Sequence, residues 1–288
     1  MELSQNTVFN TRSISRLGIG CHKLYSGFEK KRSYNIISAA LDRNITYFDT
    51  APRYGDSEKL LGQFLKGNHD VRIASKVGLS PLNLSLLKKN NNFLKREFKL
   101  IMKNNFKFAA SYLNNKLQKR YDSTVLKLNQ NIQPNLPKLI LSEEQIRISL
   151  YTSLKNLQRS HLDIFFLHEP EQYLNIEEIE DIFIKLQNEG LINLYGVGLH
   201  RHLTKEDNFG DSFVTLSMFK KEMIFKKNYN SEYSIIHGLM GFYKFGLEPQ
   251  NKKKFLDASD FLFKLSALHP NKTFLMSPSN KEQLQNIR

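Results

Sequence analysis

Four side chains that could take part in proton transfer stand at or just after strand-like segments of this sequence. One is a tyrosine, a poor acid at neutral pH because its ordinary pKa is about 10. A neighbouring ammonium group would stabilise the phenolate and lower that pKa, and a carboxylate would keep the ammonium group charged and in place. A histidine could orient a substrate carbonyl or share in the proton transfer. The four residues are Asp49, Tyr54, Lys76 and His168.

The segments that lead into Asp49, Lys76 and His168 are rich in apolar and β-branched residues, as buried strands are. Tyr54 follows five residues after Asp49, in a loop. Ligands of α/β folds bind at the carboxyl ends of strands, so the four side chains are expected at that edge. A buried carboxylate is costly unless it is paired, and Lys76 is the cation that the sequence offers to Asp49.

Strand-like and helix-like segments alternate along the whole chain. A short hairpin is expected first, at residues 7–14. Regular alternation predicts a parallel sheet, and eight repeats predict a closed barrel. We therefore expect one α/β domain over residues 1–288, a (β/α)8 TIM barrel. The predicted strands are 15–21, 45–48, 71–75, 163–168, 194–199, 213–218, 234–239 and 273–276, and the predicted helices are 33–42, 58–65, 142–157, 176–188 and 255–268, with the start of another after residue 280.

At these residues the sequence resembles the aldo-keto reductase family. The matching motifs are FDTAxxYGxSE at residues 48–58, Ser75-Lys76, the Ser-Leu-x-x-Leu helix at 153–157 that leads to Leu167-His168, and Tyr-Gly-Val-Gly at 195–198. The resemblance implies reduction of a carbonyl to an alcohol with a nicotinamide cofactor. It assigns proton donation to Tyr54, activation of that tyrosine to Lys76, support of Lys76 to Asp49, and substrate orientation to His168.

The resemblance also implies a cofactor site, with NADPH as the expected cofactor and NADH as the alternative. Residues 277–284 resemble the family's phosphate-binding turn, and a helix start there would present free backbone N–H groups to phosphate. The family's Ser-Asn pair after the fifth strand is missing, and His200 is the candidate donor in its place. The predicted cofactor-binding residues are Gly20, Cys21, Asp49, His200, Ser277, Ser279, Asn280, Lys281 and Gln283.

A long basic insertion, residues 79–141, separates the third strand from the next helix, far beyond the usual loop length. Residues 81–140 hold twelve Lys and Arg against two acids, which accounts for ten of the fourteen net positive charges. Apolar spacing predicts helices within 84–101 and 106–128. A solvated helical face is the default interpretation. The alternatives are attraction of an anionic substrate and a surface for a partner protein, a membrane or nucleic acid, of which nucleic acid is the least favoured.

Composition narrows the class of protein further. A chain of 288 residues with a single cysteine, Cys21, cannot form an internal disulfide, which favours a reducing cytoplasm. The polar start, residues 1–12, does not resemble a secretory signal, and no run is long enough to span a bilayer. His22 is interpreted as a structural residue, and no metal site is predicted, because His200 and His202 lack acidic or cysteine partners at a recognisable spacing.

Two alternatives from other functional classes stay open. One is a cofactor-binding but catalytically silent regulatory or scaffold subunit that docks through the insertion; the missing Ser-Asn pair favours it and the intact set of four residues opposes it. The other is a polyanion-binding module on a degenerate barrel, which salt-dependent heparin retention would reveal. The favoured interpretation is a cytoplasmic enzyme that acts on a small-molecule carbonyl substrate.

Overall fold

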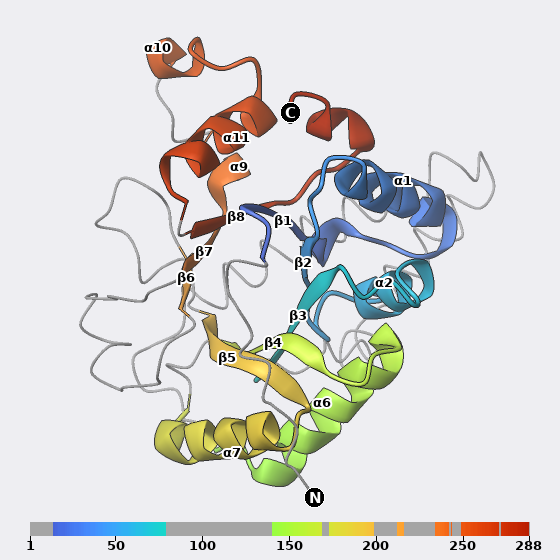
Figure 1. Cartoon of the computed structure of the whole chain (residues 1–288), viewed down its shortest axis with the longest axis vertical. Helices are drawn as coiled ribbons and strands as arrows, with labels where there is room; N and C mark the ends of the chain where they lie inside the picture. The colour runs from blue at the N-terminus through green and yellow to red at the C-terminus, as the bar shows by residue number, and fades with distance from the viewer. Residues whose placement is uncertain are drawn as a thin grey trace, which may run out of the picture. The chain divides into compact units, whose positions relative to one another are not determined.

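The computed structural model describes residues 14–78, 140–168, 173–198, 212–215, 234–241, 243, 249–270 and 272–287. Strands β1 to β8 form a closed barrel in chain order, which confirms the predicted (β/α)8 architecture (Figure 1). The strands are β1 (Leu17–Gly20), β2 (Tyr47–Asp49), β3 (Arg72–Val77), β4 (Leu162–His168), β5 (Ile192–Gly198), β6 (Ser212–Thr215), β7 (Ser234–His237) and β8 (Lys272–Met276).

Helices lie on the outside of the strands, with α1 and α2 beside β1 to β3 and with α6 and α7 beside β4 and β5 (Figure 1). The observed α7 has the bounds that the apolar spacing predicts. The helices are α1 (Lys30–Leu41), α2 (Ser57–Phe64), α6 (Glu143–Leu157), α7 (Ile176–Asn188), α9 (Leu239–Gly241), α10 (Pro249–Lys252) and α11 (Ala258–Leu268), and the 3-10 turns are η2 (Cys21–Lys23), η3 (Gly27–Glu29) and η7 (Lys281–Leu284).

The direction of β6 departs from the expected all-parallel barrel. β6 pairs antiparallel with both β5 and β7, while the other neighbouring strands pair in parallel. The apolar pattern that predicts a strand carries no direction. Thirteen residues separate β5 from β6 and eighteen separate β6 from β7, which is enough for a parallel crossover, so connection length does not set the direction of β6 either. The prediction of a wholly parallel sheet is therefore wrong at β6.

The inside of the barrel holds an apolar cluster that includes Tyr47, Ala74, Ile164, Phe166 and Leu275. Side chains alternate between the two faces of a strand, so the residues two positions further along β2, β3 and β4 share this inward face. They stand at the carboxyl ends of the strands, and they are Asp49, Lys76 and His168. The larger apolar cluster packs helices against the outer face of the barrel.

Helix α6 begins with a capping box. Ser142 Oγ accepts a hydrogen bond from the Gln145 N–H at 3.2 Å, and Gln145 Oε1 accepts one from the Ser142 N–H at 2.9 Å. Each bond satisfies a backbone donor that a helix end leaves without an intrahelical partner. The helix start that the Ser-Glu-Glu-Gln sequence predicts at residue 142 is confirmed.

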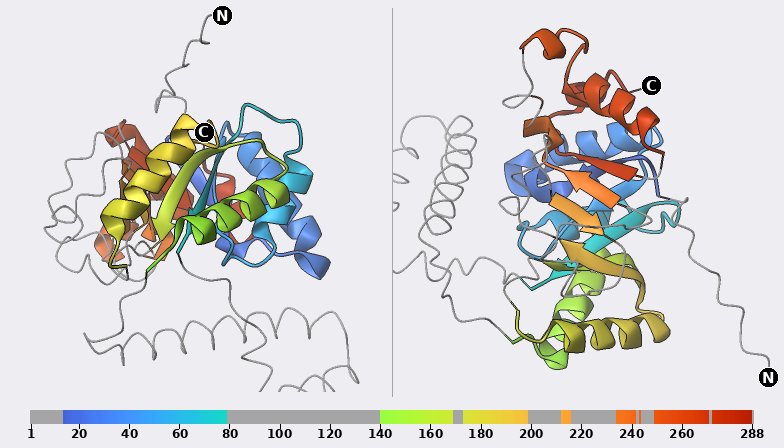
Figure 2. Two further views of the ribbon diagram at one scale, coloured as in Figure 1. Left: turned by 90° about the horizontal axis from the view of Figure 1, so that it is seen from below. Right: turned by 90° about the vertical axis from the view of Figure 1, so that its left-hand side faces the viewer.

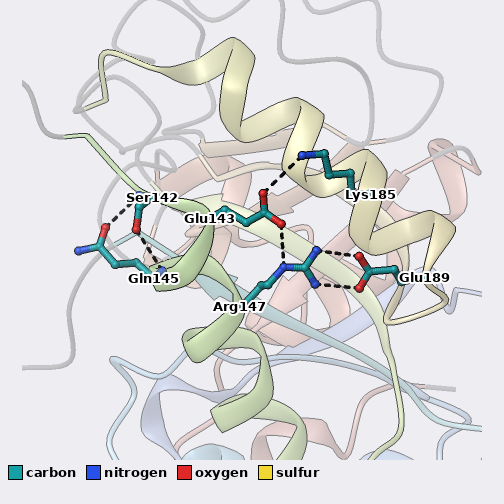
Figure 3. A network of polar contacts seen from close by, with 6 residues as sticks. All are labelled: Ser142, Glu143, Gln145, Arg147, Lys185 and Glu189. Atoms are coloured by element: carbon teal, nitrogen blue, oxygen red, sulfur yellow. Dashed lines mark hydrogen bonds and ion pairs between the residues drawn. The ribbon is translucent and has the colours of Figure 1, made fainter.

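Charged side chains join α6 to α7, which lie side by side along β4 and β5 (Figure 2). The guanidinium of Arg147 donates two hydrogen bonds to Glu189, at 2.7 and 2.8 Å, and one to Glu143 at 2.8 Å. Lys185 also reaches Glu143, at 3.4 Å (Figure 3). The planar fork of an arginine suits such bidentate pairing, so the network links α6 to α7 and to the residue that caps its C-terminus.

Some predictions fall on residues that the structure does not describe. These are the hairpin at 7–13 and the helices within 84–101 and 106–128, so the organisation of 1–288 as one domain with an insertion at 79–141 stays a prediction. An α-helix is expected to start after residue 280, but the structure has a four-residue 3-10 turn there, η7. The prediction of the helix type is therefore wrong. Within the described ranges, no helix is long and apolar enough to cross a membrane.

Candidate active site

Lys76 and Asp49 form a buried ion pair at the carboxyl edge of the barrel. Lys76 Nζ lies 2.5 Å from Asp49 Oδ1, and it also donates a hydrogen bond to the carbonyl oxygen of Thr50 at 2.9 Å. The two residues are 5 % and 3 % exposed. This is the pairing that the sequence predicts. The attraction between the two opposite charges offsets the free-energy cost of removing each from water.

The surroundings shift both pKa values. Burial alone lowers the pKa of Lys76, but the charges of Asp49 and Tyr54 outweigh it, so the pKa of Lys76 rises above its ordinary value. Burial raises the pKa of Asp49, and the Lys76 ammonium opposes that rise. An ammonium group with a raised pKa stays protonated at neutral pH and keeps its positive charge inside the barrel.

Tyr54 approaches this ammonium from the loop after β2. Lys76 Nζ lies 5.3 Å from the centre of the Tyr54 ring. The loop is held by two backbone hydrogen bonds, from Tyr54 N–H to the Ala51 oxygen at 2.9 Å and from Ser57 N–H to the Tyr54 oxygen at 3.3 Å. The structure therefore brings Asp49, Lys76 and Tyr54 together, in an arrangement that can stabilise a phenolate.

His168 ends β4 at the same edge. It pairs in register with Gly198 of β5, where a Cβ atom would stand 3.8 Å from His168 Cδ2. The imidazole is half-buried, in contrast to the fully buried Phe166 two residues earlier. Its place at the carboxyl end of β4 is the one that the sequence predicts.

The predicted cofactor residues of β1 lie beside the ion pair. Gly20 pairs in register with Asp49, and a Cβ atom at Gly20 would lie 2.7 Å from Ser277 Oγ, so a side chain there would close the space between β1 and the turn after β8. Cys21 is fully buried, and its thiol contacts the Ile19 oxygen at 3.4 Å. Burial, with the charge of Asp49, raises the pKa of Cys21, so it stays an unreactive thiol.

Residues of the turn after β8 form hydrogen bonds with one another. The Ser279 N–H donates to Gln283 Oε1 at 2.6 Å, and the Gln283 N–H donates to Asn280 Oδ1 at 3.1 Å. Lys281 is exposed at the start of η7. Because η7 is a single short 3-10 turn, the predicted helix-dipole contribution to phosphate binding is absent, and the side-chain hydroxyls of Ser277 and Ser279 remain as candidates.

Lys23 is a residue that the sequence analysis does not predict at this turn. Its Nζ atom donates to the Ser277 oxygen at 3.1 Å and lies 3.4 Å from Ser279 Oγ. The turn itself contains no arginine, so Lys23 supplies a cation from η2 instead. The sequence gives only one hint that Lys23 reaches this turn: it stands two residues after Cys21, which ends a predicted barrel strand.

His22, interpreted above as a structural residue, lies beside Tyr54, with the two ring centres 6.1 Å apart and the rings in an edge-to-face arrangement. It stands between Cys21 and Lys23, so η2 reaches Tyr54 through His22 and the turn after β8 through Lys23. His200 lies outside the described residues. In the described part of the chain, no group of three His, Cys, Asp or Glu side chains could hold a metal ion.

Known proteins resemble this chain in sequence and in fold. The model of the aldo/keto reductase family matches residues 16–204. The chain is 27% identical over 196 residues to a D-threo-aldose 1-dehydrogenase of a Pseudomonas species, covering 65% of this chain and 50% of that protein. It is also 27% identical over 192 residues to the aldo-keto reductase YhdN of Bacillus subtilis, covering 64% of this chain and 43% of that protein.

The chain thus spans about half the length of these two curated relatives. Among solved structures, an aldo-keto reductase of Klebsiella pneumoniae in complex with NADPH superposes with a TM-score of 0.55 at 16% identity, covering 95% of this chain and 84% of that one. That likeness concerns the fold. With the family model covering well over half of the sequence, the chain belongs to the aldo/keto reductase family.

Proposed function

We propose that this protein reduces a small-molecule carbonyl to an alcohol with a nicotinamide cofactor. The observation that carries the proposal is the buried Asp49–Lys76 pair, whose ammonium lies 5.3 Å from the Tyr54 ring. Family membership supports an oxidoreductase, and the solved relative bound to NADPH supports the cofactor class.

The described residues fit a nicotinamide dinucleotide at two points. Asp49 Oδ2 is buried and makes no hydrogen bond with any residue that the structure describes, so it is an acceptor that a cofactor hydroxyl would satisfy. At the other end, Lys23 Nζ stands against Ser277 and Ser279, where a cation and hydroxyl groups suit a phosphate. The bound cofactor supplies the hydride of the reaction.

The protein residues supply the proton and the orientation. Tyr54 donates its hydroxyl proton to the carbonyl oxygen as negative charge develops there. The Lys76 ammonium stabilises the phenolate that remains, and Asp49 keeps that ammonium in place. His168 binds the carbonyl oxygen and orients it toward Tyr54. The edge-to-face contact of His22 with the Tyr54 ring helps to hold that ring in place.

The test follows nicotinamide absorbance with NADPH and then NADH against a panel of aldehydes, quinones and keto-sugars. Since one relative is a D-threo-aldose 1-dehydrogenase, aldoses with the oxidised cofactor complete the panel. Turnover by the wild type that falls at least about 100-fold in Tyr54→Phe, with unchanged cofactor affinity, supports the proposal.

Tight cofactor binding without turnover of any panel member would favour the silent regulatory subunit. Turnover that survives in Tyr54→Phe would show that another group donates the proton. Equal loss of cofactor binding and turnover in that variant would assign Tyr54 to binding rather than to acid catalysis.

A further inference from the structure

The first turn of α2 contacts both segments that carry the proposed acid and its activating lysine. Glu58, in that turn, is 2 % exposed although it is a carboxylate. Its Oε1 accepts a hydrogen bond from Ser75 Oγ at 2.7 Å, and its Oε2 accepts one from Asn156 Nδ2 at 3.1 Å. No cation of the described residues pairs with it, so two neutral donors hold a buried carboxylate.

One of these bonds holds the strand of Lys76. Ser75 precedes Lys76 in β3, and because side chains alternate along a strand, Ser75 points to the helices while Lys76 points into the barrel. The Glu58–Ser75 bond therefore fixes β3 from outside, one residue from the ammonium group. Asn156 belongs to α6, so the same carboxylate also joins α2 to α6.

The residue before Glu58 holds the segment of Tyr54. Ser57 Oγ and Thr50 Oγ1 lie 2.6 Å apart in a buried hydrogen bond, and the Ser57 N–H donates to the Tyr54 oxygen at 3.3 Å. The carbonyl oxygen of Thr50 in turn accepts a hydrogen bond from Lys76 Nζ. Two consecutive residues of α2 thus contact the tyrosine loop and the lysine strand.

We propose that Glu58 is a positioning residue that sets the distance between the Tyr54 ring and the Lys76 ammonium; this role rests on the proposed reductase function. A carboxylate accepts from both donors at once, whereas an amide would turn an NH2 group toward one of them. The partial positive charge at the start of α2 offsets the cost of the buried negative charge.

The experiment compares Glu58→Gln, Ser75→Ala and Asn156→Ala with the wild type in kcat, in both KM values and in the dependence of kcat on pH. We expect kcat to fall between about 10- and 100-fold in Glu58→Gln and Ser75→Ala, with both KM values little changed, because misplacing a catalytic group costs rate rather than binding. Asn156→Ala removes a bond of the same carboxylate that does not reach β3, so its kcat should fall less.

A control separates positioning from folding. Arg147→Met breaks the α6–α7 network away from the site, and it should lower the melting temperature without changing kcat per folded molecule. Full kcat and an unchanged pH profile in Glu58→Gln would overturn the proposal, and so would equal losses of kcat in Ser75→Ala and Asn156→Ala.

A second readout does not need turnover. The absorbance change on tyrosine ionisation, taken as the difference between each variant and the same variant with Tyr54→Phe, reports Tyr54 alone. In Glu58→Gln this change should move to higher pH, because a displaced ammonium stabilises the phenolate less. An unmoved titration would contradict the positioning role even if no substrate is found, while a shifted titration without turnover would leave the role standing and count against the reductase function.

Discussion

Lys76 Nζ lies 2.5 Å from Asp49 Oδ1 inside the barrel, and each charge is the other's only ion-pair partner among the described residues. Lys76→Met should therefore leave a buried carboxylate without a cation and lower the free energy of unfolding by about 3–5 kcal/mol. The double variant Asp49→Asn/Lys76→Met removes both charges, so most of the stability should return while turnover stays lost. Urea unfolding and cofactor oxidation measure the two effects. A double variant as unstable as Lys76→Met would contradict this account.

Lys23 contacts the carbonyl oxygen of Ser277 although 254 residues separate them in the chain. Lys23→Gln should weaken cofactor binding by about 10-fold or more, because a charge-assisted hydrogen bond to phosphate is lost. Fluorescence titration with NADPH and NADH identifies the phosphate. Equal loss for both cofactors indicates the diphosphate, and loss for NADPH alone indicates the 2′-phosphate. Unchanged affinity for both would remove Lys23 from the cofactor site.

Tyr195 of β5 has a pKa raised to about 12, first by burial and then by Glu180. The folded state therefore holds the phenol proton more tightly than the unfolded state, whose tyrosines ionise near pH 10. The stability that this group contributes is complete below about pH 10 and is lost as the pH rises toward 12. Tyr195→Phe should flatten the decline of the urea midpoint over that range and remove the late step from the alkaline absorbance titration.

The Arg147 network on α6 and α7 is exposed, so its contribution should depend on salt. Arg147→Met should lower the urea midpoint at low ionic strength, and the difference from wild type should shrink when salt is raised to about 1 M, where the Debye length is about 3 Å. Lys155→Met, which removes a charge from α6 outside this network, is the matched control. A difference that does not respond to salt would show that Arg147 acts through packing of its aliphatic stem.

Gly62 lies in α2, where alanine favours a helix by about 1 kcal/mol over glycine. A Cβ atom there would nevertheless meet the backbone of Asn156 and Leu157 in α6. Overpacking costs about 1–3 kcal/mol, so Gly62→Ala should destabilise the protein, as thermal unfolding would show. Lys59→Ala, on the exposed face of α2, should change stability little. A stabilised Gly62→Ala would mean that the two helices can separate without loss.

The sequence predicts most of the barrel, because strand alternation and helix spacing depend on neighbours only a few residues apart. The carboxyl ends of the predicted strands place Asp49, Lys76 and His168 at one edge, and the bounds of α7 follow from its apolar spacing alone. The family model then confirms the class of protein that the motifs around Tyr54 indicate.

The tertiary structure decides the contacts that join distant segments. β6 is antiparallel because direction is set by how the chain returns to its neighbours, which an apolar pattern does not encode. Closing the barrel between β1 and β8 brings Lys23 to Ser277, and packing α2 on α6 brings Glu58 to Asn156. These pairs have no local signature, since they form only where the strands and helices meet in space.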